Sequence, residues 1–329
     1  MIMLIIKKLK SKSLYTEIIS KKLKGKVTMS EVTISNELLK AVINPDYGAA
    51  VLAFYVKKDK KEIAIMPDSR KDSNSLDASS FLMIPYSNRI EDGTFTFNEK
   101  NHQLKNGKNH SIHGDTRKSK WIIEEINQDR IICYFDSSKY KDVNWPWPFS
   151  AEVDYSISGN TFKSRITLKN NGDTPMPAGF GWHPYYSRSL TKENEPVFVQ
   201  FETEGVYPDI NENCIPSGNP EKPFGKLDFS IEKQLDPKVH IDNCYQGYNG
   251  KGHMLWPDSG IKVSYECSPE CSHLIFFNPD DPFFAFEPAT NANNGVNHFN
   301  DEVFKCGTVS LKPGEKLSAS FSIKIDFIS

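Results

Sequence analysis

The sequence lacks the cysteine and histidine spacings that hold zinc and the long apolar segments that cross membranes. Its 329 residues include six cysteines, with no C-x-x-C pair and no matching cluster of histidines, which excludes the common zinc-ligand patterns. At this density of cysteine a disulfide framework is not expected, so we predict reduced thiols in a cytoplasmic protein. No segment approaches the ~20 apolar residues of a membrane span.

An excess of charge of one sign is also lacking. The formal net charge is −2 and 25% of the residues are charged. These values give no reason to expect nucleic acid or an anionic membrane as a partner. The composition is that of an ordinary soluble globular protein. A small neutral molecule is therefore the expected partner, bound by a monomer or a homodimer.

Residues 1–28 differ from the rest because they contain eight lysines and a single acidic residue, Glu17. Their apolar start, MIMLII, precedes the lysines and is shorter than the ~7–15 residue core of a signal peptide. A basic amphipathic helix over Leu9 to Leu23 is one alternative. We expect instead a dispensable extension, followed by a single domain over residues 29–329.

From Met29 onward the sequence has the two-residue periodicity of β-strands. Near the C-terminus, Phe321, Ile323, Ile325 and Phe327 alternate with polar residues, as in a half-buried strand. Runs of strand-forming residues around turn residues predict hairpins at 95–104, 121–135 and 311–321. No window after residue 28 sustains a helical period. The sequence thus predicts an all-β fold, an antiparallel sandwich or barrel.

Four segments combine reactive side chains with strand and turn residues, namely IPYSNRIEDGTF (84–95), NHSIHGD (109–115), GFGWHPYYSR (179–188) and HLIFFNPDDPFFAFEPAT (273–290). The most informative is the last, where Glu287 stands in an aromatic and apolar run. A buried carboxylate must find partners or shift its pKa upward, and a raised pKa suits a general base. Each histidine or arginine alone is more often structural.

The order and flanking residues of these segments resemble the aldose 1-epimerase (galactose mutarotase) family, and within it the bacterial branch with a G-x-G-W-H-P-Y motif. The matching segments run in family order from Phe81 to Thr290, and residues 32–56 are similar to the family's opening strands. The resemblance therefore covers nearly everything after Met29. N-R-I-x-x-G-x-F, H-G, W-H-P-Y and F-E-P in register form a specific combination.

The resemblance implies a large twisted antiparallel β-sandwich and a cofactor-free, metal-free interconversion of the α and β anomers of a free aldose such as glucose or galactose. It implies a catalytic base, a catalytic acid and a set of sugar-binding residues, which are respectively Glu287, His183, and Asn88, Arg89, His113 and Asp242. The chemistry fits these residue types. A carboxylate takes the proton of the C1 hydroxyl while an imidazolium protonates the ring oxygen.

Three features depart from the family pattern, namely Asp115 after H-G, Cys244–Tyr245, and ATNANNGVN (289–297) after F-E-P. The last of these bears on the substrate, because the corresponding segment of the family lies near the sugar. A sugar phosphate is one alternative substrate, because Arg117 and Arg188 follow the two histidine motifs and arginine is suited to phosphate. Glycoside hydrolysis by a pair of carboxylates, Asp242 and Glu287, is another alternative. A carbohydrate-binding protein without catalysis is a third.

The aromatic segment NWPWPF (144–149) has two interpretations. Trp145, Trp147 and Phe149 supply an apolar face for a pyranose ring, or they pack at the entrance of a proline-kinked strand. The sequence does not choose between these.

Overall fold

The computed structural model describes residues 31–71, 76–105, 107 and 110–328, which belong to one compact unit. The predicted extension over residues 1–28 and the helix over Leu9 to Leu23 lie outside the described residues. The described residues are nearly all β, with short 3-10 turns as their only helices. None of those helices is long and apolar enough to cross a membrane.

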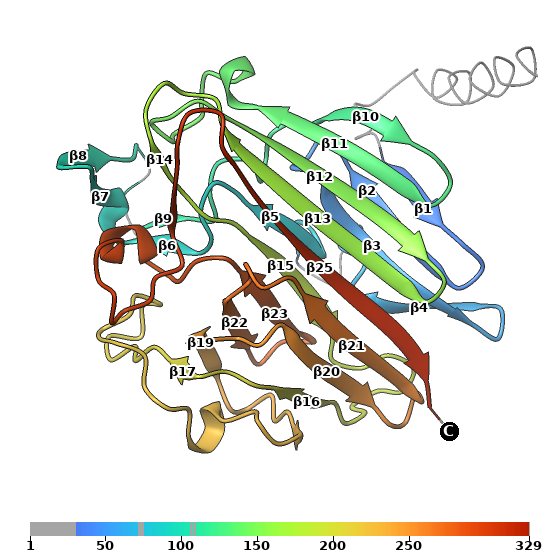
Figure 1. Ribbon diagram of the computed structural model, residues 1–329. Coiled ribbons are helices and arrows are strands. Elements are labelled where there is room, and N and C mark those ends of the chain that lie inside the picture. The colour runs from blue at the N-terminus through green and yellow to red at the C-terminus, as the bar shows by residue number, and fades with distance from the viewer. Residues whose placement is uncertain (1–30, 72–75, 106, 108–109, 329) are drawn as a thin grey trace, which may run out of the picture. The chain divides into compact units, whose positions relative to one another are not determined.

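Two large antiparallel sheets lie face to face (Figure 1). The first sheet has ten strands; nine follow the order β1 (Val32–Ser35), β2 (Leu39–Asn44), β3 (Ala50–Lys58), β5 (Ser80–Met83), β15 (Gly181–Ser187), β23 (Phe283–Ala289), β22 (His273–Asn278), β19 (Ile241–Gln246) and β17 (Gly205–Val206), and β4 (Lys61–Met66) pairs with β3. The second sheet has nine strands, in the order β10 (Ile122–Ile126), β11 (Arg130–Asp136), β12 (Phe149–Ser158), β13 (Thr161–Asn170), β25 (Lys316–Phe327), β21 (Ile261–Cys267), β20 (Lys251–Trp256), β16 (Phe198–Phe201) and β18 (Lys233–Gln234).

Shorter elements connect these sheets. Three two-stranded ladders are β6 (Arg89–Ile90) with β9 (Ser111–Ile112), β7 (Thr94–Phe97) with β8 (Lys100–Gln103), and β14 (Met176–Ala178) with β24 (Val309–Leu311). The 3-10 turns are η2 (Glu91–Gly93), η3 (Ser137–Lys139), η4 (Gly225–Leu227) and η5 (Gly295–His298). The predicted all-β sandwich is therefore confirmed.

The main apolar core fills the space between the two sheets, because most of the long strands have one apolar, buried face. In β25, Phe321, Ile323 and Ile325 are buried while Lys324 between them is exposed. The aromatic ring of Trp182 packs against Phe321 across the interface between the sheets. The two-residue alternation in the sequence thus placed Phe321, Ile323 and Ile325 inward, but Phe327, at the end of the strand, is 43% exposed.

Two of the three predicted hairpins are confirmed, and the third is wrong. Strands β7 and β8 pair, as do β10 and β11. In segment 311–321, however, β24 pairs with β14, and β25 pairs with β13 and β21. Gly314 does turn the chain, with φ of +79°, but the turn carries it from a small ladder into the second sheet. Turn residues identify a change of direction without identifying the strands that pair.

The outer face of the first sheet carries two smaller apolar clusters. One contains Phe81, Met83 and Tyr185 on β5 and β15. The other contains Cys244 and Ile275 on β19 and β22. Strands β15 and β23 run between these clusters, so polar side chains on their outer face have apolar surroundings on both sides.

Candidate active site

His183 and Glu287 lie side by side on the outer face of the first sheet. The register of β15 and β23 pairs Gly181 with Ala289 and Tyr185 with Ala285, which puts His183 opposite Glu287. The His183 Nε2 atom is 3.1 Å from the Glu287 Oε1 atom, and the two residues are only 6% and 2% exposed. The structure therefore brings together the two residues predicted to move protons.

The Glu287 carboxyl group is in an environment that resists ionisation. Burial raises its pKa well above the usual range, and the nearby charge of Asp242 acts in the same direction, while Arg89 opposes them. Its Oε2 atom has no hydrogen-bond partner among the described protein groups. A hydroxyl group that reached this oxygen would satisfy it.

The His183 imidazole is held in its neutral form. Burial lowers its pKa to about 3, with the positive charge of Arg117 as a further cause. Phe81 stacks on the imidazole at 4.4 Å between ring centroids. The resemblance to the family implied an imidazolium at His183 beside a carboxylate at Glu287. Burial instead favours a neutral carboxylic acid beside a neutral imidazole, because a carboxylate and an imidazolium cost more free energy in an apolar environment. Both forms of the pair hold the same single proton.

His113 meets this pair from a separate segment. Its ring is 5.1 Å from that of His183, edge to face, and burial lowers its pKa well below the usual value. The chain reaches this position with φ of +65° at His113. The amide of His113 donates to the carbonyl of Asn88 at 2.7 Å, which joins the N-R and H-G motifs.

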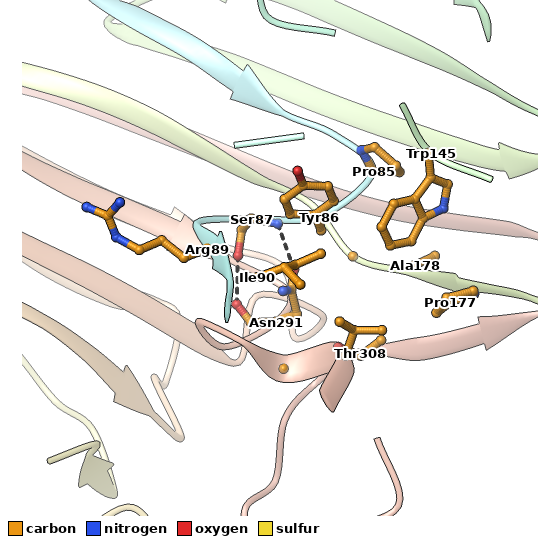
Figure 2. Close-up of a pocket in the computed structure, with 13 residues that line it drawn as sticks. Pro85, Tyr86, Ser87, Arg89, Ile90, Trp145, Pro177, Ala178, Asn291 and Thr308 are labelled. Atoms are coloured by element: carbon orange, nitrogen blue, oxygen red, sulfur yellow. Dashed lines mark hydrogen bonds between the residues drawn. The ribbon is translucent and has the colours of Figure 1, made fainter. Parts of the chain in front are cut away.

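Asn88 and Arg89 are placed by the β6–β9 ladder, where Arg89 pairs with Ile112. Figure 2 shows the Arg89 side chain extending away from Trp145 and Thr308, which line a small neighbouring pocket. The charge of Arg89 lowers the pKa values of Glu287, Asp242 and His113. Arg89 thus belongs with the acidic groups of the site, and Asn88, 5% exposed, carries an unpaired side-chain oxygen beside it.

Gly114 allows the turn of the H-G motif to pack closely against the backbone of Ile84, which follows β5. Its φ is +68°, and a Cβ atom there would overlap the backbone of Ile84. We expect Gly114→Ala to lower the melting temperature strongly or to prevent folding, because strain and overlap add. Gly159→Ala is the matched control, since Gly159 also has a positive φ but no atom within 4 Å of its added Cβ. It should cost only about 1 kcal/mol. Equal melting temperatures of the two variants would contradict this interpretation.

Asp242 reaches the site from β19, two strands from Glu287. Its register partner is Phe277 of β22, which in turn pairs with Ala285 of β23. Burial raises the pKa of the Asp242 carboxyl group, while Cys214 and Arg89 oppose the shift. The Cys214 thiol donates a hydrogen bond to Asp242 Oδ2 at 3.1 Å. Sequence analysis had no signal for Cys214, because it lies in a loop of Asn, Pro and Gly residues.

The aromatic segment is packing and not a sugar platform. Trp145, Trp147 and Phe149 are all buried. Trp145 stacks on Phe95 at 5.1 Å, and Trp147 donates to Thr174 Oγ1. Asp115, the residue that departs from the family pattern, accepts the backbone N–H groups of Asn144 and Trp145. Asp115 therefore fixes the loop that carries these tryptophans.

The pocket in Figure 2 is a small space behind the site. Ser87 is bound there to Asn291 by two hydrogen bonds, from its amide and its hydroxyl group. The space open to a water-sized sphere is about 10 Å³, which suffices for about one water molecule. This space is too small for a sugar. The residues that line it, such as Ser87 and Asn291, therefore have a supporting role.

The two arginines considered for phosphate recognition have different surroundings. Arg188 donates to the carbonyl oxygens of residues 279, 281 and 283 and to Asn278, and it lies over Phe284 of the main core. It holds a loop and does not face His183. Arg117 lies 3.9 Å above the ring of Phe81, on the side of the site, with Asp77 at 3.8 Å.

No group of three or more His, Cys, Asp and Glu side chains in the described part of the chain could hold a metal ion. All six cysteines are free thiols.

Comparison with known proteins identifies the family. Residues 30–324 match the family model described as aldose 1-epimerase. Uncharacterized protein YphB of Escherichia coli K12 is 22% identical over 311 residues, which cover 91% of this chain and 100% of that protein. A crystal structure of a galactose mutarotase-like protein from Clostridium acetobutylicum has a TM-score of 0.77 and 23% identity, covering 93% of this chain and 98% of that one.

A second solved structure, galactose 1-epimerase from Lactobacillus acidophilus NCFM, has a TM-score of 0.71 and 15% identity, covering 91% of this chain and 95% of that one. These structures share the two-sheet fold described above. Because the family model matches almost the whole chain after residue 29, the protein belongs to the aldose 1-epimerase family.

Proposed function

We propose that the protein is an aldose 1-epimerase that interconverts the α and β anomers of a free aldose such as glucose or galactose. The observation that carries the proposal is the buried contact of 3.1 Å between His183 Nε2 and Glu287 Oε1. The two oxygens of a hemiacetal are bonded to the same carbon. An acid and a base that serve both oxygens must therefore lie close together, as these two groups do.

In each ring opening or closure the pair gives one proton to the sugar and takes another from it, so it holds one proton before and after the step. The shared proton passes from Glu287 to His183, which leaves a carboxylate and an imidazolium. Glu287 then removes the proton of the C1 hydroxyl while His183 protonates the ring oxygen, and the C1–O5 bond breaks. The open-chain aldehyde is thus formed beside a neutral pair, the form that burial favours. Rotation about C1–C2 and the reverse steps close the other anomer.

The remaining groups position the sugar. Arg89, Asn88 and His113 offer donors and acceptors around the pair, and the Asp242 carboxyl group, close to the charge of Arg89, offers acceptors. Hydrogen bonds to several hydroxyls hold C1 in place, which is the positioning contribution to catalysis. The buried unpaired atoms Asn88 Oδ1, His113 Nδ1 and Glu287 Oε2 are the groups that sugar hydroxyls would satisfy.

Polarimetry of freshly dissolved α-glucose and α-galactose tests the proposal. The protein should accelerate the approach to the equilibrium rotation without any added cofactor. Binding of sugar by titration without acceleration would identify a carbohydrate-binding protein instead. Release of the phenol from an aryl glycoside would support hydrolysis, although the direct partner of Glu287 is a histidine and not the second carboxylate that hydrolysis needs.

A free aldose is the proposed substrate in part because Arg188 donates to groups of residues 278–283 and does not face His183. We expect Arg188→Met to lower stability by roughly 1–3 kcal/mol, since several carbonyl groups lose a charged donor. The ratio of rates for glucose 6-phosphate and glucose should not change. Arg117→Met is the matched comparison for this ratio of rates, because Arg117 lies beside the site and Arg188 does not face it. A selective loss of glucose 6-phosphate turnover in Arg188→Met would contradict the structural role.

A further inference from the structure

Cys214 is the one cysteine whose thiol contacts a proposed sugar-binding residue. It lies in the loop after β17, and its Sγ atom is 3.1 Å from Asp242 Oδ2. Tyr207, Asp209, Asp242 and Asn293 line a small pocket together with Cys214. Asn293 is 3% exposed, and its Oδ1 atom has no hydrogen-bond partner among the described residues.

The loop holds the thiol in this place by its backbone. The Cys214 amide donates to Asp209 Oδ2 at 2.8 Å, and its carbonyl oxygen accepts from Asn293 Nδ2 at 2.9 Å. The residue adopts φ of +63°, which is uncommon for a side chain other than Gly, Asn or Asp. The two hydrogen bonds of its backbone and its positive φ thus hold the Cys214 thiol beside Oδ2 of Asp242.

We propose that Cys214 is a positioning residue for substrate binding, which sets the orientation and the charge of Asp242. This inference rests on the proposed function. The thiol donates to Oδ2, and in this proposal a sugar hydroxyl binds to Oδ1. A donated hydrogen bond favours the carboxylate form and opposes the effect of burial on the pKa of Asp242. Arg89 and His240 also lower this pKa, and Asp209 raises it.

The thiol is suited to this role because it stays protonated. Burial, followed by the charge of Asp242, raises the pKa of Cys214 to about 12, while Arg89 opposes the shift. At neutral pH it is therefore an S–H donor and a poor nucleophile. The proposed role depends on the hydrogen bond and not on thiol reactivity, so a hydroxyl in the same place should replace it.

Kinetics of three variants test the role. Cys214→Ala should raise KM for the sugar about threefold or more and change kcat less than twofold, because Asp242 contacts hydroxyls away from the reacting carbon. The acid limb of kcat/KM should also move to higher pH, since Asp242 loses a donor. Cys214→Ser should restore both values. Cys267→Ala, which removes a half-buried thiol of β21, should behave as wild type.

Alkylation by iodoacetamide tests the contact without using activity. In Asp242→Asn the neighbouring charge is gone, so Cys214 should react about threefold faster or more at pH 8.5, measured by mass spectrometry against Cys267 in the same digest. A wild-type protein without anomerisation activity would contradict the proposed function. The alkylation rates would then show by themselves whether Cys214 and Asp242 interact.

Two results would overturn the inference. One is Cys214→Ala with the KM and pH profile of the wild type. The other is an equal loss of kcat and thermal stability in Cys214→Ala and Cys214→Ser, which would show a role in packing alone.

Discussion

Glu287→Gln should lower kcat for anomerisation by about 10²–10⁴-fold, the usual contribution of a positioned general base. Glutamine keeps the size and hydrogen bonding of the side chain beside His183 but cannot accept the proton of the C1 hydroxyl. The measurement is polarimetric relaxation of α-glucose or α-galactose. Glu195→Gln is the matched control, because Glu195 is a buried glutamate bonded to Ser259 and Leu190, and it should leave the rate unchanged.

The same variant should be at least as stable as the wild type at pH 8. Burial raises the pKa of Glu287 in the folded protein, so the unfolded state loses its proton first as pH rises. Stability therefore falls with pH from the unfolded value of about 4.3 up to the folded pKa. Glutamine does not titrate and avoids this loss. A thermal melt shows whether the lost activity comes with a lost fold, and full activity in a folded Glu287→Gln would refute the assignment.

His183→Asn should also slow anomerisation by about two orders of magnitude or more. Asparagine is too short to reach Glu287 as the Nε2 atom of His183 does, and it cannot deliver a proton to the ring oxygen. His273→Asn is the matched control, because His273 is another buried histidine of the same sheet, bonded to Ser272 and Tyr207. Its replacement should lower stability without slowing the reaction in the folded protein. Equal rates for the two variants would remove His183 from the mechanism.

The stability of His183→Asn should depend less on pH than that of the wild type in acid. The folded pKa of His183 is about 3, below the unfolded value of about 6.5. The unfolded state therefore takes up a proton first, and the wild type loses stability as pH falls from about 6.5 to 3. Denaturant unfolding at pH 4 and pH 7 measures the difference.

The resemblance read from the motifs identified the residues that converge, but it did not identify their protonation. His183 and Glu287 meet because the register of β15 and β23 puts them opposite one another. Their neutral state follows from the apolar clusters on either side. No local pattern carries that information, since the residues of those clusters come from segments far apart in the chain.

The flanking sequence also did not show which candidate side chains face the site and which pack elsewhere. Arg188 follows the W-H-P-Y motif and comes directly after β15, yet its guanidinium group lies over Phe284 of the main core. Trp145 stacks on an aromatic neighbour rather than facing the site. Cys214 stands in a loop without regular pattern and contacts Asp242.

The sequence by itself determined the all-β class, the inward face of strands such as β25, and Glu287 as a carboxylate in an apolar run. Alternation and burial are local properties, so they can be read from neighbours in the chain. Only the tertiary structure decided which strands pair, which arginine is occupied, and where Cys214 lies. Those outcomes depend on contacts between residues distant in sequence, which arise only when the two sheets and their connecting loops are packed together.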